Sequence, residues 1–254
     1  MASDNMEERV TAAVLVIGDE ILSGRTQDTN SNAIARFLGP FGIEMREVRV
    51  VGDRQAEIVE ALNALRARYT YVFTTGGIGP THDDITADAI ATAFGVGIDL
   101  NPEALALLRA RLKSGDLNEA RKRMARIPFG ASLIRNPVSA APGFQIENVF
   151  VMAGVPSIMQ AMLEDVAPRL TRGQVIHTAT ITASIGEGTI AAPLARVQKE
   201  HPEVSIGSYP FYQAVGFGVH LVARGTNLES VEKAAQAIEA IVRDAGAEPS
   251  RRSP

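Results

Sequence analysis

The chain has 254 residues, of which 46% are hydrophobic and 21% are charged, so a packed globular protein of one large or two small domains is expected. A net charge of −4 gives no electrostatic basis for a nucleic-acid partner, and the absence of cysteine excludes disulfides and thiol catalysis. No apolar run reaches the length of a membrane span and the N-terminus lacks a signal-peptide core, so we expect a cytoplasmic protein without a membrane partner.

The first half of the chain alternates between predicted strands and helices. Apolar or alternating runs predict strands over residues 10–17, 43–51 and 71–75. Helical spacing of apolar residues predicts helices that begin near Asn30, at Ala56 and at Asp83. This order predicts an α/β domain with a doubly wound, mostly parallel sheet, in which the loops after the strands meet at the ligand-binding carboxyl edge.

The remaining elements divide into two groups. Residues 102–112, 118–127 and 157–163 are predicted helices, and 148–152 is a predicted strand. From residue 174 an alternating pattern in the order β-α-β-β-α predicts a small α+β domain. We therefore expect domains over residues 10–170 and 174–245, with flexible tails over 1–9 and 246–254.

A glycine turn follows the third predicted strand. Gly76, Gly77, Gly79 and Pro80 would let a ligand approach the backbone closely. Placed before a helix N-terminus, the turn would offer N–H groups and a positive dipole end to an anion. The turn is therefore a candidate phosphate cradle.

Carboxylates stand beside this candidate cradle. Asp83, Asp84 and Asp88 follow it directly, and this proximity indicates a divalent metal ion between the carboxylates and a phosphate. The alternative is that Asp83 only caps the next helix. The loops after the first and second strands add Asp19, Glu20, Asp28 and Asp53 to the same sheet edge.

A basic segment at residues 109–126 and His82 leave two interpretations open. The basic segment would either steer an anionic ligand or form the solvated face of a helix. His82 would either contact a ligand or be an ordinary turn residue. No dinucleotide fingerprint, P-loop or metal-binding histidine spacing occurs in the chain.

Five motifs together resemble the molybdopterin-binding domain of the CinA (competence/damage-inducible) family. They begin at Gly18, Asp28, Val51, Thr74 and Ala153 and read GDEILSG, DTNS, VGD, TTGGIGPTHDD and AGVP. The resemblance covers roughly residues 10–170 and extends to the MoaB/MogA proteins of molybdenum cofactor synthesis and to the N-terminal half of eukaryotic FAD synthases. Residues 174–245 resemble the small middle domain of CinA-type proteins. The amidohydrolase domain of full-length CinA has no counterpart here, so we do not expect nicotinamide mononucleotide deamidation.

The resemblance implies a MoaB/MogA-like fold, a homo-oligomer (dimer or trimer) and a set of site residues. Asp53 and Asp84 match positions implicated in catalysis, and Asp83, Asp84 and Asp88 would hold a divalent metal, with Mg²⁺ expected. The ligand would be molybdopterin, another pterin phosphate or a nucleotide. The implied substrate-binding residues are Gly18, Asp19, Glu20, Ser23, Gly24, Asn30, Thr75, Gly76, Gly77, Gly79, Pro80, Thr81, Gly154 and Pro156.

Three functional hypotheses follow. The first is a binding protein for a pterin phosphate. The second is a metal-dependent pyrophosphatase that acts on ADP-ribose or FAD through Asp53 and Asp84. The third is a non-catalytic oligomeric scaffold, because Ile158 stands where relatives often have glutamate.

Overall fold

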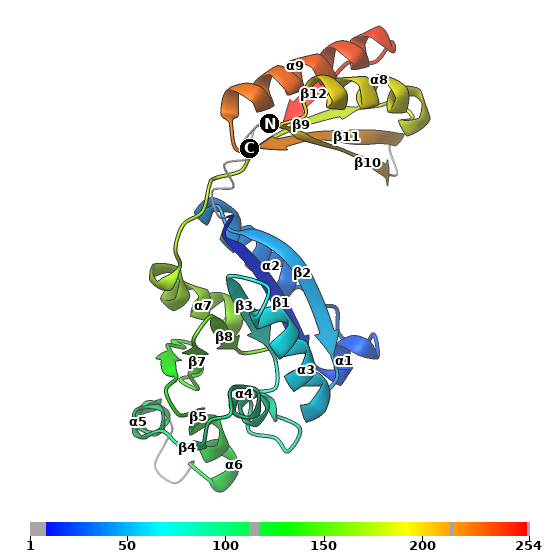
Figure 1. The fold of residues 1–254 in the computed structure, drawn as a ribbon. Helices are drawn as coiled ribbons and strands as arrows, with labels where there is room; N and C mark the ends of the chain where they lie inside the picture. Colours follow the sequence, from blue (N-terminus) through cyan, green and yellow to red (C-terminus); the bar gives the residue numbers. More distant parts are fainter. Residues whose placement is uncertain (1–8, 112–116, 214–215, 253–254) are drawn as a thin grey trace. The chain divides into compact units, whose positions relative to one another are not determined.

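The computed structural model describes residues 9–111, 117–213 and 216–252, and the chain divides between residues 173 and 174 into two compact units (Figure 1). Most of the expected N-terminal tail, residues 1–8, lies outside the described residues. So do Leu112, at the end of a predicted helix, and residues 253–254.

The first unit contains a six-stranded sheet in the order β2-β1-β3-β8-β7-β6. The first four strands in this order are parallel, and the pairs β8–β7 and β7–β6 are antiparallel, so only β7 runs in the opposite direction. The predicted doubly wound, mostly parallel sheet is therefore confirmed. Its strands are β1 (Thr11–Ile17), β2 (Glu44–Val51), β3 (Tyr71–Thr75), β6 (Ser132–Ile134), β7 (Gly143–Ile146) and β8 (Val149–Met152).

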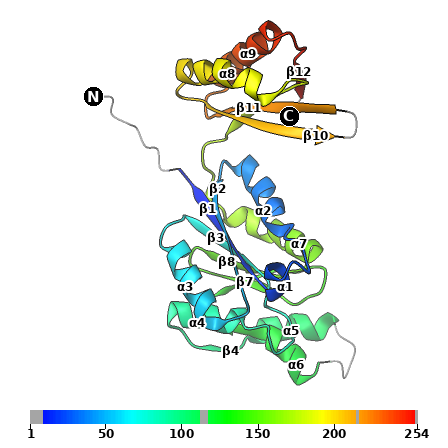
Figure 2. The same ribbon diagram turned by 90° about the vertical axis from the view of Figure 1, so that its right-hand side faces the viewer.

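Helices cover both faces of this sheet (Figure 2). Along β1, Ala13, Leu15 and Ile17 pack on the side of α3 and α4, whereas Ala12, Val14 and Val16 pack on the side of α2 and α7. Burial on both faces explains why β1 is an unbroken apolar run. The helices are α2 (Asn30–Leu38), α3 (Gln55–Arg66), α4 (Thr86–Phe94) and α7 (Pro156–Val166), with short 3₁₀ turns η1 (Gly39–Phe41) and η3 (Ala167–Arg169).

Three local predictions are wrong in this unit. A four-residue helix, α1 (Asp19–Leu22), occupies the expected first loop, and α4 begins at Thr86 instead of Asp83. The helix predicted over 118–127 is a short helix followed by a 3₁₀ turn and a strand. This segment lies in an insertion built from β4 (Ile98–Leu100), α5 (Pro102–Arg111), α6 (Glu119–Lys122), η2 (Arg123–Ala125) and β5 (Arg126–Pro128). Strands β4 and β5 pair as a separate antiparallel ribbon.

The second unit is a small α+β domain, as predicted, with an antiparallel sheet in the order β10-β11-β9-β12. Helices α8 and α9 contribute Ile190, Leu194 and Ile238 to its own apolar core. The expected flexible tail over 246–254 is wrong at residues 250–252, which form β12 against β9. The elements are β9 (His177–Ala183), α8 (Glu187–Glu200), β10 (Ser205–Gln213), β11 (Gly216–Gly225), α9 (Leu228–Asp244) and β12 (Ser250–Arg252). Across the described ranges of both units, none of the helices has the length and apolar character needed to cross a membrane.

Candidate functional site

The loops singled out in the sequence meet at one edge of the sheet. Ile17 pairs with Val51, Val16 with Thr75, and Thr75 with Met152, so the four parallel strands end side by side. The loops that follow β1, β2, β3 and β8 therefore border one surface. Topology alone brings together residues that are more than 100 positions apart in the chain.

The turn after β3 is built on two glycines with positive φ, +106° at Gly76 and +66° at Gly77. A Cβ at Gly76 would lie 2.1 Å from the carbonyl oxygen of Ile17, and one at Gly77 would lie 2.2 Å from Thr86 Oγ1. Thr86, fully buried at the start of α4, donates its hydroxyl to the Gly76 carbonyl at 2.9 Å and its amide to the Gly77 carbonyl at 3.0 Å. Thr86 thus holds the glycine turn in place through two hydrogen bonds. The spacing of hydrophobic residues in the sequence did not predict this role.

The next part of the turn leaves backbone donors available. The amides of Gly77, Ile78 and Gly79 donate to no acceptor within the described part of the chain. They border a cavity of about 20 Å³, the glycine-turn cavity, whose wall also contains Asp84 and Arg123. Free amides at a strand-to-helix turn are the groups that bind phosphate oxygens in other proteins.

Asp84 is held by a small turn of its own. Its Oδ2 accepts hydrogen bonds from the Thr81 amide at 2.8 Å and the Thr81 hydroxyl at 2.6 Å, and its amide donates to the Thr81 carbonyl at 3.3 Å. Asp83 and the neighbouring His82 are exposed, and Ile85 occupies the N-cap of α4 without a side-chain hydrogen bond. The alternative role of Asp83 as a helix cap is therefore wrong, because the Thr81–Asp84 turn closes before the helix begins.

Asp53, after β2, lies in an acidic surrounding. Its Oδ2 accepts a hydrogen bond from the Asp19 amide at 2.9 Å. Burial raises the pKa of Asp53, and the charges of Asp19, Glu20 and Asp83 raise it further, against the hydrogen bond from Asp19, which lowers it. A cation bound beside Asp53 would therefore stabilise its ionised form by offsetting the neighbouring negative charges.

This pKa shift predicts that Asp53→Asn stabilises the fold at about pH 7, because the amide removes a charge that the folded state disfavours. The folded state raises the pKa, so wild-type stability falls as the pH rises through the pKa of Asp53. The advantage of the variant should therefore disappear by about pH 3, where the wild-type carboxyl is protonated. Urea unfolding at both pH values measures the effect, and equal gains at both would contradict this explanation.

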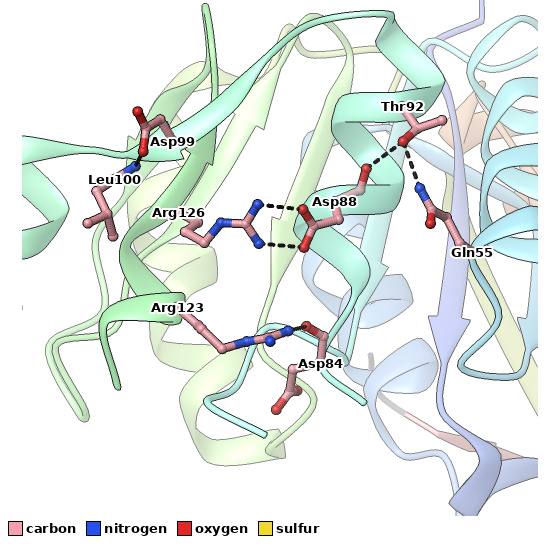
Figure 3. Close-up of polar contacts among 8 residues, drawn as sticks. All are labelled: Gln55, Asp84, Asp88, Thr92, Asp99, Leu100, Arg123 and Arg126. Carbon is pink, nitrogen blue, oxygen red and sulfur yellow. Dashed lines mark hydrogen bonds and ion pairs between the residues drawn. The ribbon is translucent and has the colours of Figure 1, made fainter. Parts of the chain in front are cut away.

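The structure gives Asp88 a different neighbour from the one expected. Both oxygens of Asp88 accept hydrogen bonds from the Arg126 guanidinium, each at 2.7 Å (Figure 3). Gln55 of α3 donates a 2.8 Å hydrogen bond to Thr92, which lies one turn after Asp88 in α4. A metal ion at Asp88 would have to displace the bidentate ion pair, a strong arrangement for a carboxylate.

The donor set for a metal is small. Within residues 9–111, 117–213 and 216–252, no three histidine, aspartate or glutamate side chains are placed to hold an ion together. Mg²⁺, however, is commonly bound by one or two carboxylates together with the phosphates of a substrate. Asp84 beside the glycine-turn cavity fits that second arrangement, in which the ion and the phosphate bind together.

A second cavity of about 50 Å³, the Asn30 cavity, lies at the same sheet edge between the first and fourth loops. Asn30 starts α2, where its amide donates to Asp28 Oδ1 at 2.9 Å, and its Nδ2 donates to the Gly154 carbonyl at 2.7 Å. The Oδ1 atom of Asn30 is buried and has no hydrogen-bond partner among the described residues. The hydrogen bond between Asn30 and Gly154 connects the loop after β1 with the loop after β8, two loops that were predicted to share a ligand.

The predicted site residues divide between these places. Those that line the glycine-turn cavity are Gly77, Gly79, Asp84 and Asp88. Those that line the Asn30 cavity are Glu20, Asn30, Thr75, Gly154 and Pro156. Those that line neither cavity are Gly18, Asp19, Ser23, Gly24, Asp53, Gly76, Pro80, Thr81 and Asp83. Arg123 and Arg126 line the first cavity, although the sequence left the basic segment open between two interpretations.

Comparison with known proteins accounts for both units. Residues 13–172 match the family model described as a probable molybdopterin binding domain, and residues 175–249 match the one described as FAD synthase, middle domain. A protein of Aeropyrum pernix is 36% identical over 253 residues, which cover 93% of this chain and 92% of that protein. A CinA-like protein of Chloroherpeton thalassium is 31% identical over 245 residues, which cover 91% of this chain and 58% of that protein.

Two solved structures are similar to the first unit. The crystal structure of CinA from Thermoplasma acidophilum, described as having unknown function, is 35% identical with a TM-score of 0.60, and the match covers 63% of this chain and 96% of that chain. The molybdopterin biosynthesis enzyme MoaB of Thermus thermophilus is 22% identical with a TM-score of 0.44 over 63% of this chain and 91% of its own. The chain therefore belongs to the molybdopterin-binding-domain family, as a CinA-like member whose second domain is of the FAD synthase middle-domain type and not an amidohydrolase.

Proposed function

We propose that the chain binds a phosphate-bearing heterocycle, either a pterin phosphate or a nucleotide, at the carboxyl edge of β1, β2, β3 and β8. The observation that carries this proposal is the glycine turn, whose free amides at Gly77, Ile78 and Gly79 border a cavity beside the Asp84 carboxylate. The match to a probable molybdopterin binding domain supports a pterin ligand, and the match to an FAD synthase domain supports a nucleotide.

A divalent metal ion, with Mg²⁺ as first choice, would join the ligand at Asp84. Thr81 fixes Oδ2 of this carboxylate, and Oδ1 has no hydrogen-bond partner within the described residues. When bound, the ion would offset the repulsion between the carboxylate and the phosphate. Asp83, the exposed residue directly before Asp84 in the chain, would supply a further oxygen ligand to the ion.

A second candidate function is the hydrolysis of a nucleoside diphosphate such as ADP-ribose or FAD. The raised pKa of Asp53 favours it, because a raised pKa makes a carboxylate a better proton acceptor. In this reaction the oxygen of a water molecule bonds to one phosphorus, the bridging P–O bond breaks, and Asp53 accepts the proton of the water. The glycine-turn amides would stabilise the negative charge that develops on the phosphoryl oxygens.

The two candidates separate in one set of measurements on the whole chain. ADP-ribose and FAD are incubated with the protein and Mg²⁺, Mn²⁺ or Co²⁺, or with EDTA, and the products are separated by chromatography. Metal-dependent release of AMP supports hydrolysis. Saturable calorimetric binding of ADP-ribose or molybdopterin without turnover supports a binding function alone. The absence of both binding and turnover would refute the proposed function.

A further inference from the structure

Two arginines of the insertion, Arg123 and Arg126, line the glycine-turn cavity, and they differ in the hydrogen bonds that they make (Figure 3). Arg126 uses two nitrogens on the two oxygens of Asp88, at 2.7 Å each, so its charge is matched. Arg123 makes one long hydrogen bond, 3.4 Å from Nη2 to the main-chain oxygen of Asp84. Its Nε is buried and has no hydrogen-bond partner in the described part of the chain.

A buried guanidinium N–H without an acceptor is unfavourable, and native proteins seldom keep one without a reason. An anion in the adjoining cavity would supply the acceptor that the protein does not. Gly77, Gly79 and Arg123 line the same cavity, so the glycine turn with its free amides and the side chain that carries the unpaired Nε border one space.

The size of this cavity restricts what enters it. A volume of about 20 Å³ accommodates roughly one water-sized group, which is enough for a phosphoryl oxygen and too little for a pterin or adenine ring. Ala87, Ile127 and Phe144 form apolar parts of the wall, and such surroundings strengthen a charge-assisted hydrogen bond. The Asp84 carboxylate borders the cavity too, so an entering anion needs the positive charge of Arg123 beside it.

We infer that Arg123 is the anion-binding side chain of this site and takes a phosphoryl oxygen of the ligand through its Nε–H. The heterocyclic ring then remains outside the glycine-turn cavity. This inference rests on the proposed function and deepens it, because it assigns the phosphate end of the ligand to the side of the turn that faces the insertion. A guanidinium suits this position because its planar fork offers parallel donors to phosphate.

Calorimetric titration of the full chain in EDTA tests the assignment, since metal-bridged binding is then removed. The probes are ADP-ribose, inorganic pyrophosphate, which lacks a ring, and adenosine, which lacks a phosphate. Arg123→Gln should weaken the binding of ADP-ribose and of pyrophosphate by about tenfold to a hundredfold, as expected for loss of a hydrogen bond between charged groups. Its affinity for adenosine should stay at the wild-type level.

Lys122→Gln is the matched control, because it removes the same charge one residue earlier. Lys122 pairs with Glu119 at 2.6 Å and does not line the cavity, so its loss should change the affinity for pyrophosphate by less than about twofold. Arg123→Lys keeps the charge and loses the Nε donor, so its affinity for pyrophosphate should lie between those of the wild type and Arg123→Gln. Thermal melting of Arg123→Gln should stay close to that of the wild type, because Nε has no protein partner and the only hydrogen bond lost among the described residues is the long one, 3.4 Å, from Nη2 to the main-chain oxygen of Asp84.

Equal pyrophosphate affinities of Arg123→Gln and Lys122→Gln, with saturable binding by the wild type, would overturn the inference and leave the proposed function intact. Wild-type protein that binds none of ADP-ribose, molybdopterin and pyrophosphate, with or without Mg²⁺, would overturn both. Should Arg123→Gln fail to fold, Arg123→Lys decides the matter: wild-type affinity for pyrophosphate in that variant would refute the role of Nε.

Discussion

Gly76→Ala should cost the first domain about 3 kcal/mol or more of unfolding free energy, which is in the severe range for a single substitution. The new Cβ would lie 2.1 Å from the carbonyl oxygen of Ile17, a backbone atom at the end of a fully packed strand. A φ of +106° adds strain for any residue with a Cβ. Relief would require β1 and β3 to separate at the site, so the turn itself would be displaced. Urea unfolding followed by circular dichroism measures the loss.

Gly95→Ala is the control for the backbone conformation alone. Gly95 ends α4 with a φ of +65°, and a Cβ there would meet no atom within 4 Å. Its replacement should therefore cost only about 1 kcal/mol, the penalty for a left-handed alanine. If the two variants lost the same stability, the contact with Ile17 would not be the reason that position 76 requires glycine.

Asp84→Asn should have opposite effects on ligand binding with and without metal. In Mg²⁺, the variant should lose at least about a hundredfold in ADP-ribose affinity or turnover, because an amide oxygen is a poor substitute for a carboxylate on a divalent ion. In EDTA, the variant should bind pyrophosphate more tightly than the wild type, because a negative charge that borders the glycine-turn cavity is removed. Calorimetry under both conditions compares the two effects.

The asparagine can still accept the hydrogen bonds of Thr81, so the local turn should persist in this variant. Asp244→Asn removes the same charge from the exposed end of α9 in the second domain and should change neither measurement. Weaker pyrophosphate binding by Asp84→Asn in EDTA would show that Asp84 supports the site through structure and not through its charge.

The parts of the fold that the sequence predicted well are those set by burial. The apolar run of β1 is buried on both faces, and Ile34 and Leu38 of α2 lie on the buried side that their helical spacing predicts. Parallel strands then bring their carboxyl ends to one edge by topology, so Asn30 could be placed near Gly154 without knowledge of any side-chain position.

The features that the sequence missed depend on competing local bonds or on distant packing. Thr81 and Asp84 close a turn of their own, and Thr86 bonds back to Gly76, so α4 starts three residues later than its apolar spacing indicates. Arg123 is a site residue only because the insertion folds back beside the turn, whereas its neighbour Lys122 is an ordinary surface residue paired with Glu119. No spacing rule distinguishes these two basic residues.

The last described strand, β12, determines which strands form the edges of the sheet in the second domain. Strand β9 is hydrogen-bonded to β11 on one side and to residues 250–252 on the other, and Arg251 reaches Glu232 of α9 at 2.6 Å. The similarity to the FAD synthase middle domain ends at residue 249, just before this strand. An uncovered edge strand offers unpaired N–H and C=O groups to any other chain. Three residues beyond the family boundary thus occupy the edge of β9 that would otherwise be open to pairing with a second molecule.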